Sequence, residues 1–306
     1  MRVCVVGAGV VGSYVAWRLS EAGYRVTLFE RARSPGKKAC SGLVSSRIWD
    51  FFPKTEEIVE GSLRSIDLRL GSGLFRVRLD PGLLILNREG LDALAFELAS
   101  SSAEVRTRTP VTRVSPGPFV FAGRKMKFDA VLGCDGPLSA VRRSLGLPDP
   151  GFRLGLVRRV PNGRDGCEVE ATPSGFCWRL GRGKSTEFGI LEKPSTAPGL
   201  FRKRFGSPDS GSLVPSGLVQ PKDPDFALLG DAAGLTKPWS GGGIIWSLTA
   251  CEILLESFPD LTEGKERISA FFRPKFAVSR IGEIFARLGF VPRKMDPDWP
   301  PLTKFK

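Results

Sequence analysis

The chain has 306 residues and a formal net charge of +13, with 42% hydrophobic and 25% charged residues. These values are typical of a globular protein with one large domain or two closely packed ones. The sequence contains no histidine, which excludes Ser-His-Asp and Cys-His hydrolases and zinc proteases with an H-E-x-x-H motif. The charge favours an anionic substrate or a membrane surface over nucleic acid, because no nucleic-acid motif accompanies it.

The six cysteines form no C-x-x-C pair, so we expect neither a metal site nor a disulfide framework. No apolar run reaches the ~18 residues needed to cross a bilayer. The N-terminus leads directly into an apolar strand, without the pattern of a secretory leader. We therefore expect a cytoplasmic protein, with peripheral attachment to a membrane as an open alternative. Without histidine, a cofactor that carries the reaction itself is favoured.

The first 31 residues form a dinucleotide-binding pattern. An apolar strand (residues 3–6) precedes Gly7, Gly9 and Gly12, and a helix and a second strand follow. Glycines at this spacing allow a tight turn, close approach of a pyrophosphate, and packing of the helix on the strand. Glu30 lies 18 residues after Gly12, near the spacing of a carboxylate that holds ribose hydroxyls. The expected cofactor contacts here are Gly7, Gly9, Val10, Gly12, Glu30 and Arg31.

The pattern then departs from repeated strand–helix units. Residues 63–79 alternate around a Gly71-Ser72-Gly73 turn, which predicts a β-hairpin. Asn87 is placed to cap a helix, and residues 105–114 and 119–132 are predicted as strands. A second β-rich block is expected at residues 151–160, 168–172, 176–180 and 187–191.

A buried strand (residues 226–229) then leads to Gly230-Asp231, and a glycine-rich loop precedes a helix that begins at Ile244. Residues 264–288 are predicted to be helical, with an interruption near Pro274. This order indicates an α/β fold: a Rossmann-like nucleotide-binding domain with an inserted antiparallel β-sheet domain and a short C-terminal helical region. The expected divisions are 1–62, 80–150 and 215–257 for nucleotide binding, 63–79 and 151–214 for the β-rich substrate domain, and 258–306 for a helical segment and basic tail.

Three motifs in this order carry a resemblance to a known family. They are the glycine unit with Glu30, Asp135-Gly136 in LGCDGPLSAVRRSLG, and Gly230-Asp231 in ALLGDAAGLTKPWSGGGI. Over most of residues 1–257, the chain resembles FAD-dependent oxidoreductases of the para-hydroxybenzoate-hydroxylase type, and among them the geranylgeranyl reductase family. The resemblance implies FAD as the cofactor, bound by the Rossmann-like domain.

The resemblance also implies further cofactor contacts. Asp231 is expected at the ribityl or pyrophosphate part of FAD, and Arg88 matches an arginine that contacts the cofactor. A helix N-terminus after the glycine-rich loop would stabilise negative charge on the reduced flavin ring. The implied set is Cys40, Ser41, Gly42, Arg88, Val111, Asp135, Gly136, Gly230, Asp231, Ala232, Gly241, Gly242, Gly243 and Ile244.

Two softer features point to the geranylgeranyl reductases. The segment Pro35-Gly36…Cys40-Ser41-Gly42 resembles a loop that brings a cysteine near the flavin; Cys40 is a candidate proton donor, and the alternative is a structural cysteine. On the strand at 176–180, side chains of one face are expected to line an isoprenoid cavity or, alternatively, to fill a core. Leu180-Gly181 replaces the usual Phe-Pro, and the C-terminal region is short, so the cavity size stays open. The expected cavity residues are Phe176, Trp178, Leu180 and Trp239.

The function implied by the resemblance is reduction of a polyprenyl C=C bond by hydride transfer from reduced FAD, with protonation of the neighbouring carbon. The implied partners are a prenyl lipid or other apolar substrate, an electron donor that is NAD(P)H or a ferredoxin-like carrier, and an anionic membrane surface. Two alternatives stay open: an aromatic-type FAD monooxygenase, and a flavin-binding protein without catalysis.

Overall fold

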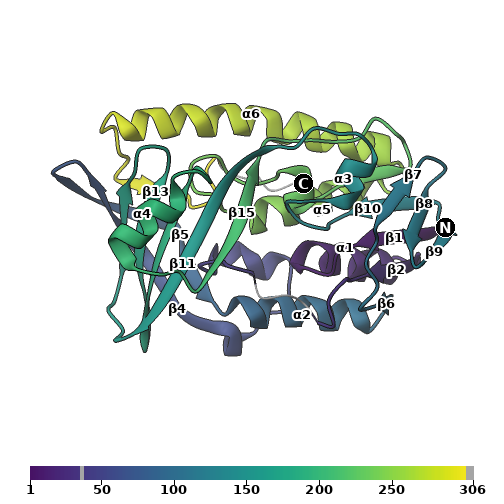
Figure 1. Ribbon diagram of the computed structural model, residues 1–306, viewed down its shortest axis with the longest axis horizontal. Coiled ribbons are helices and arrows are strands. Elements are labelled where there is room, and N and C mark those ends of the chain that lie inside the picture. The colour runs from purple at the N-terminus through teal and green to yellow at the C-terminus, as the bar shows by residue number, and fades with distance from the viewer. Residues whose placement is uncertain (35–37, 301–306) are drawn as a thin grey trace.

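The computed structural model describes residues 1–34 and 38–300. Pro35 and Gly36, part of the expected cysteine loop, lie outside these ranges. Figure 1 shows a parallel sheet at the N-terminal end, a large sheet at the other end, and a long helix along both. The hairpin of residues 59–86 projects at the end opposite to the N-terminus. The fold is therefore α/β, as predicted, with the inserted sheet beside the nucleotide-binding half.

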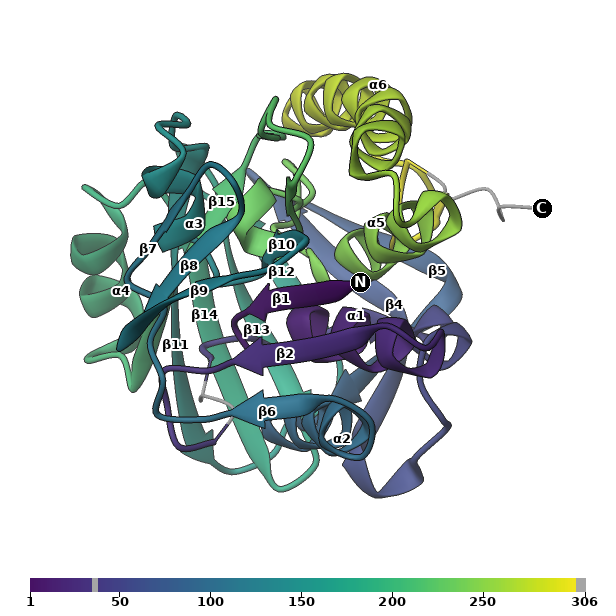
Figure 2. The same ribbon diagram turned by 90° about the vertical axis from the view of Figure 1, so that its right-hand side faces the viewer.

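The parallel sheet carries the glycine-rich turn. Its strands are short apolar runs, and Val3, Cys4 and Val5 are fully buried, as expected for a parallel sheet covered on both faces. Helices lie on one side of it and a small meander on the other (Figure 2). In sheet order the strands are β16 (Phe226–Leu228), β10 (Ala130–Gly133), β1 (Arg2–Val6), β2 (Arg25–Phe29) and β6 (Glu104–Arg106), and the helices are α1 (Val10–Glu21), α2 (Arg88–Ser100) and α5 (Ile244–Ser257).

The large sheet is mainly antiparallel. The predicted hairpin is present and longer than expected, because β4 and β5 continue past residues 63 and 79. A parallel pair, β12 with β4, joins the hairpin to the second β-rich block. In sheet order the strands are β15 (Ser210–Ser216), β11 (Gly151–Pro161), β14 (Ser185–Glu192), β13 (Phe176–Arg182), β12 (Cys167–Ala171), β4 (Val59–Leu70), β5 (Gly73–Leu86) and β17 (Lys294–Met295), with β3 (Leu43–Ser45) also on β5.

The remaining elements cover the sheets or connect them. The predicted cap of α2 is present, since the Asn87 side chain accepts a hydrogen bond from the Gly90 N–H at 3.1 Å. Phe201 of α4 is fully buried against the large sheet. The bounds are α3 (Ala140–Ser144), α4 (Ala197–Phe205), α6 (Leu261–Arg287), and the short 3-10 helices at Ser46–Asp50, Glu56–Ile58 and Gly230–Ala233.

Two local predictions were wrong. Residues 105–132 form short strands instead of two long ones: β6, the meander of β7 (Arg113–Ser115), β8 (Phe119–Ala122) and β9 (Arg124–Lys127), and β10. Gly123, with φ +72°, turns the chain between β8 and β9. The expected interruption at Pro274 is also absent, because α6 runs through it. Phe272 and Phe276 both pack on Trp246 of α5, with ring centroids 5.3 Å apart, and hold the helix across the proline.

The expected domain boundaries at residues 62 and 79 fall inside β4 and β5, and the boundary at 215 falls inside β15. These strands belong to the large sheet along their whole length, so a division at strand ends describes the structure better. Within the described ranges, no helix is long and apolar enough to cross a bilayer.

Candidate active site

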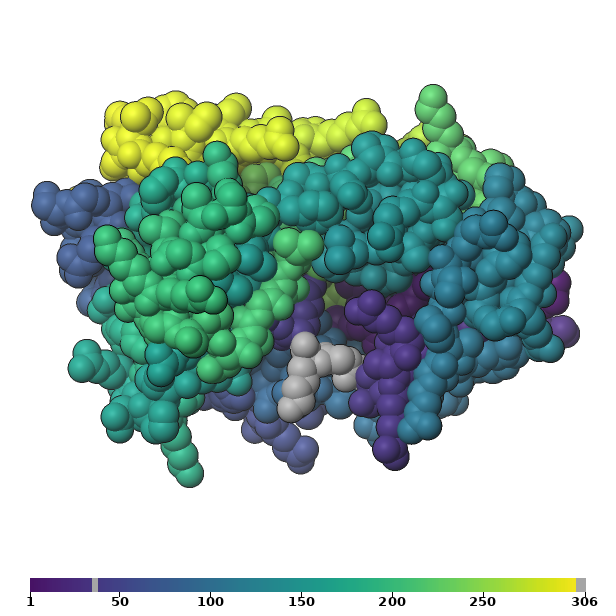
Figure 3. Space-filling view, viewed as in Figure 1, coloured from purple at the N-terminus to yellow at the C-terminus, as the bar shows by residue number. Residues whose placement is uncertain are grey.

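A cavity of about 1650 Å³ opens between the two halves of the molecule. Its wall includes the turns after β1, β2 and β10, residues of the large sheet, and the last turns of α6. Figure 3 shows the surface hollowed beside β15. Pockets for one drug-sized ligand usually measure ~300–1000 Å³. The cavity therefore has room for a nucleotide cofactor together with a second ligand.

The turn between β1 and α1 needs its three glycines for separate reasons. Gly7 has φ +96°, and a Cβ there would lie 2.6 Å from the Cys134 carbonyl oxygen. A Cβ on Gly12 would lie 1.9 Å from the Gly7 carbonyl oxygen, so this glycine lets α1 pack on the turn. Gly9 has an ordinary φ of −71°, and a Cβ there would meet nothing within 4 Å. Gly9 lines the cavity, so its missing side chain leaves space for a diphosphate at the N–H groups of α1.

Glu30 lines the cavity directly after β2. One carboxylate oxygen accepts a hydrogen bond from the Ala8 N–H and the other from the Ala32 N–H, both at 2.8 Å. These bonds fix the glycine turn and the next loop relative to each other. Because a carboxylate offers about four acceptor sites, acceptor capacity remains for ligand hydroxyls.

Asp135 and Arg88 each keep a buried polar atom that has no hydrogen-bond partner among the described residues. Asp135 Oδ2 accepts from the Ala140 and Val141 N–H groups at 2.7 and 3.2 Å, whereas Oδ1 is unpaired. Arg88 Nη2 donates to Asp92 at 2.9 Å, whereas its Nε is unpaired. Burying such groups unpaired costs about 1–3 kcal/mol each. Both residues line the cavity, so the two atoms fit the polar part of a ligand such as FAD.

Cys40 lies next to this arginine. Burial opposes the charge on Arg88, yet Asp92 and Cys40 raise the pKa of its guanidinium above the ordinary value. Arg88 therefore stays cationic beside the thiol. Cys40 is half-buried and lines the cavity, and its Sγ accepts a hydrogen bond from the Gly42 N–H at 3.4 Å. Its position facing the cavity suits contact with a ligand.

The loop that carries Cys40 is held by the buried side chain of Arg182 on β13. Its guanidinium donates to the Ser41 carbonyl oxygen and, at 3.1 Å, to the Leu86 carbonyl oxygen. Two carboxylates, Glu60 and Glu187, neutralise Arg182. The antiparallel sheet thus fixes the position of the cysteine loop.

A second helix N-terminus faces the cavity at α5. The preceding glycine-rich loop closes on itself, since the Lys237 N–H donates to the Gly242 carbonyl oxygen and the Gly241 N–H donates to the Lys237 carbonyl oxygen, at 3.0 and 2.8 Å. Gly243 provides no side-chain cap, which leaves the first N–H groups of α5 available. Nearby, Asp231 forms an ion pair with Lys38. Lys38 was not among the expected site residues, because no spacing relates two residues so distant in the chain.

Residues 294–299 line the cavity and fasten this loop; we call this segment the C-terminal clasp. The Asp298 carboxylate accepts hydrogen bonds from Ser45 (2.6 Å), Arg47 (2.9 Å) and Lys237 (3.2 Å). Burial alone would raise the pKa of Asp298, but the charge of Lys237 and the hydrogen bonds from Ser45, Arg47 and Lys237 hold this pKa below its ordinary value. The Trp239 indole N–H also donates to the Trp299 carbonyl oxygen at 3.0 Å. None of these clasp residues was expected at the site.

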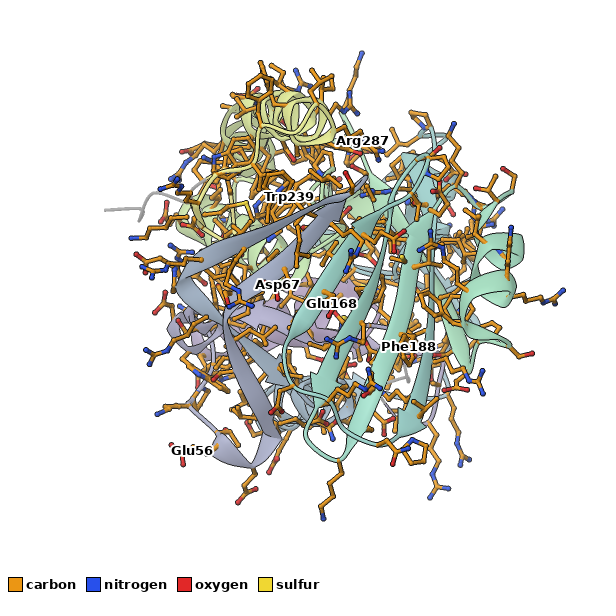
Figure 4. The ribbon with its side chains drawn as sticks, turned by 90° about the vertical axis from the view of Figure 1, so that its left-hand side faces the viewer. Glu56, Asp67, Glu168, Phe188, Trp239 and Arg287 are labelled. Atoms are coloured by element: carbon orange, nitrogen blue, oxygen red, sulfur yellow. The ribbon has the colours of Figure 1, made fainter. Side chains whose placement is uncertain are left out.

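The other end of the cavity is lined mainly by apolar side chains. Trp178 lies against Gly189, where a Cβ would be 2.0 Å from the indole ring, and its N–H donates to Glu187 at 3.1 Å. Phe176 and Trp239 line the cavity with it, and Figure 4 shows Trp239 below α6. Leu180 does not line the cavity: it is fully buried in a separate cluster with Leu63 and other residues of the large sheet. Apolar residues of the wall that were not expected include Ile66, Leu68, Val77, Leu79, Val278, Ile281, Phe285 and Phe290.

Most of the expected cofactor contacts converge on the cavity, and the exceptions have clear positions. Gly12 lies behind the turn it packs on, Ala232 is fully buried, and Gly42 sits against the Leu86 backbone. These three residues do not line the cavity. Those that do are Gly7, Gly9, Val10, Glu30, Arg31, Cys40, Ser41, Arg88, Val111, Asp135, Gly136, Gly230, Asp231, Gly241, Gly242, Gly243 and Ile244.

Comparison with known proteins also indicates FAD as the cofactor. Residues 2–90 match the family model described as FAD dependent oxidoreductase. A geranylgeranyl diphosphate reductase of Rhodobacter capsulatus is 26% identical over 284 residues, which cover 79% of this chain and 71% of the relative.

Two solved structures share the fold. A geranylgeranyl bacteriochlorophyll reductase-like protein of Thermoplasma acidophilum has a TM-score of 0.77 at 18% identity, covering 95% of this chain and 88% of the other. A 2-methyl-3-hydroxypyridine-5-carboxylic acid oxygenase has a TM-score of 0.73 at 15% identity, covering 94% and 93%. The resemblance noted in the sequence is confirmed: FAD is the cofactor, and the chain is an FAD-dependent oxidoreductase that resembles the geranylgeranyl reductases.

Proposed function

We propose that the protein reduces a carbon–carbon double bond of a geranylgeranyl-type prenyl lipid. The observation that carries the proposal is the continuity of the cavity, which extends from the polar groups at Gly9 and Asp135 to the apolar side chains of Phe176, Trp178 and Phe285. An elongated apolar substrate matches the second half of this space. The named activity of the Rhodobacter relative supports the same substrate class.

Different residues would bind the cofactor and position the substrate. Reduced FAD, when bound, supplies a hydride. The N-termini of α1 and α5, with Glu30, Arg88 and Asp135, would hold its polar parts. An isolated alkene accepts hydride poorly, so the site must position it closely and supply a proton to the neighbouring carbon. Trp178, fixed by Glu187, and Trp239, fixed by the clasp, would position the chain.

We assign the proton donor or relay to Cys40. Its thiol is half-buried, lines the cavity and lies beside a cationic arginine.

The other proposals concern partners. The electron donor would be NAD(P)H or a ferredoxin-like carrier, and the protein would attach peripherally to an anionic membrane. We also propose that the chain divides into a nucleotide-binding half and a β-rich substrate half, with the expected boundaries shifted to the ends of the strands. This division agrees with the roles given above to the residues at the two ends of the cavity.

The test is anaerobic reoxidation. The holoenzyme is reduced by light, oxygen is excluded, and a geranylgeranyl lipid or its fully saturated analogue is added in detergent. We expect the oxidised-flavin absorbance to return only with the unsaturated lipid, and mass spectrometry to show added hydrogen in the product. Absence of reoxidation by several prenyl lipids would reject the proposal.

One competing function has an observation in its favour. The fold is shared with the pyridine-carboxylate oxygenase, which indicates that this architecture also serves monooxygenases. A monooxygenase would consume oxygen and hydroxylate a small ring substrate. In the anaerobic experiment, its flavin would stay reduced after the prenyl lipid is added. It would be reoxidised only when oxygen is then admitted, with the prenyl lipid left unchanged.

A further inference from the structure

Exposed apolar side chains gather at one end of the molecule. They lie on the last turns of α6, on the segment after it, and at the tip of the β4–β5 hairpin, all at the end opposite to the N-terminus (Figure 1). Leu288 and Phe290 are 67% and 69% exposed. We call this set the apolar rim: Leu74, Phe75, Val278, Ile281, Ile284, Phe285, Leu288 and Phe290.

The two parts of the rim are fastened together. After α6 the chain returns as β17, which pairs in parallel with β5, and the Arg78 N–H donates to the Arg293 carbonyl oxygen at 2.9 Å. Arg287, at the end of α6, donates to the Thr172 carbonyl oxygen at 3.0 Å; Figure 4 shows it beside the strand ends of the large sheet. The rim is therefore part of a fixed surface.

The rim is continuous with the cavity. Val278, Ile281, Phe285 and Phe290 are exposed and also line the cavity wall. These four apolar side chains thus connect the rim with the interior of the cavity. Ile284 and Leu288 belong to the rim but not to the cavity wall. Contact with a substrate inside the cavity therefore does not account for their exposure.

Basic side chains border the rim. Arg69 and Arg78 are exposed on the hairpin, and Arg280 and Arg293 are exposed beside the end of α6. The acids Asp67, Asp80 and Glu283 are each paired with a cation: Arg76, Lys294 and Arg287. The border is therefore net positive, in agreement with the chain's charge of +13. Apolar groups flanked by cations match the surface of an anionic lipid bilayer.

We propose that the apolar rim docks the protein on an anionic membrane, so that a lipid tail passes from the bilayer into the cavity; the second clause rests on the proposed function. A second copy of this chain fits the rim less well. A symmetric contact would place the arginines of one rim against those of the other. A bilayer instead accepts the apolar groups below its headgroups and attracts the arginines.

The test is cosedimentation of the holoenzyme with phosphatidylcholine vesicles, with and without phosphatidylglycerol. The variant Ile284→Glu/Leu288→Glu places two charges at the C-terminal end of α6, at residues that do not line the cavity. The matched control, Ala93→Glu/Ser100→Glu, places two charges at exposed positions of α2, on the other side of the molecule. Turnover with detergent-dispersed prenyl lipid is measured in parallel.

We expect the wild type and the control to bind the anionic vesicles, with at least about tenfold weaker binding to phosphatidylcholine alone. The Ile284→Glu/Leu288→Glu variant should bind about a hundredfold more weakly. Its turnover in detergent should equal that of the wild type.

Three outcomes would overturn the proposal: no vesicle binding by the wild type, equal binding by the variant, or a wild-type dimer that this variant converts to a monomer in light scattering. Vesicle binding does not require turnover. Binding without turnover would therefore retain the docking surface and reject the proposed reaction.

Discussion

The two ends of the cavity differ in the chemistry that lines them. At the nucleotide end, backbone N–H groups at helix starts and a few buried charges face a space kept open by glycines such as Gly9. At the far end, the wall consists of side chains such as Phe176, Trp178 and Phe285, and part of it is exposed. The first end suits a charged cofactor of fixed shape, and the second suits an apolar chain.

This difference indicates which substitutions the fold tolerates at each end of the cavity. Backbone atoms that pack on other backbone atoms cannot move aside, so a substitution at the nucleotide end acts on folding or on cofactor affinity. Side chains at the far end can be shortened with little effect on folding, and such changes should act on substrate affinity.

The largest effect is expected at the β1–α1 turn. Gly12→Val would place a Cβ 1.9 Å from the Gly7 carbonyl oxygen, so the free energy of unfolding should fall by more than about 4 kcal/mol. Gly9→Val is the matched variant, because a Cβ there meets nothing within 4 Å. Its apoprotein should unfold within about 1 kcal/mol of the wild type. Thermal and urea unfolding of both apoproteins and of the wild type measures these differences in the free energy of unfolding.

The same Gly9→Val variant should bind FAD at least about a hundredfold more weakly, because its side chain would occupy the approach to the α1 N–H groups. Fluorescence titration of the apoprotein with FAD measures the affinity. Unchanged FAD affinity in a folded Gly9→Val protein would place the diphosphate elsewhere.

The next effect concerns the C-terminal clasp. Asp298→Asn should lower the free energy of unfolding by about 3 kcal/mol at neutral pH, because it leaves Lys237 buried without its counterion. It should also weaken FAD binding by displacing the glycine-rich loop. Asp80→Asn is the control; it removes only the exposed pair with Lys294 and should change little.

The clasp also predicts a pH dependence. The pKa of Asp298 lies below its ordinary value of 3.8 in the folded protein, so its carboxylate stabilises the fold above that pH. This stabilisation is lost as the pH falls through the lower folded pKa. The difference in unfolding free energy between wild type and Asp298→Asn should therefore shrink below about pH 4. A constant difference down to acid pH would assign the effect to something other than the charge.

A smaller effect tests Cys40. Cys40→Ala should lower kcat for prenyl reduction about a hundredfold if the thiol supplies the proton. FAD affinity should stay within about threefold of the wild type, because Arg88 and Asp135 remain in place. Cys40→Ser, which keeps a donor, should recover part of the rate. Equal kcat for Ala, Ser and wild type would make Cys40 a structural residue.

The smallest effect tests the far end. Phe285→Ala should raise KM for a long prenyl lipid about fivefold, because it removes part of an apolar wall that is already half-exposed. A short prenyl substrate that does not reach α6 should be unaffected. Ile284→Ala, on the same helix but outside the cavity wall, serves as the control. Equal changes in KM for the long and the short substrate would indicate that the prenyl tail binds elsewhere.

The nucleotide end of the cavity was predicted from local patterns in the sequence. The glycine spacing, Glu30, Asp135-Gly136 and the Asn87 cap each depend on residues within one turn or one strand–helix unit, so they can be read without the fold. The hairpin was predicted for the same reason, since strand alternation is visible over a few residues.

Phe176, Trp178 and Trp239 of the far end were expected from the resemblance, but the contacts that join distant parts of the chain could not be predicted. Asp298 meets Ser45 and Arg47 about 250 residues away, as Lys38 meets Asp231, and no periodicity relates such positions. Leu180 shares a strand face with Phe176 and Trp178, yet Leu63 and Ile85 cover it. The cavity wall on α6 was missed because no local pattern in residues 264–288 indicates which part of the molecule this helix packs against.

The most direct test of the central claim is a crystal structure of the FAD complex with a non-reducible geranylgeranyl lipid analogue. We expect the diphosphate of FAD at the α1 N–H groups beside Gly9, a hydroxyl group of the cofactor at Asp135 Oδ1, and the prenyl tail between Trp178 and Phe285, with one double bond beside Cys40. A tail bound outside this cavity, or a cofactor that fills the apolar end and leaves no room for it, would contradict the account.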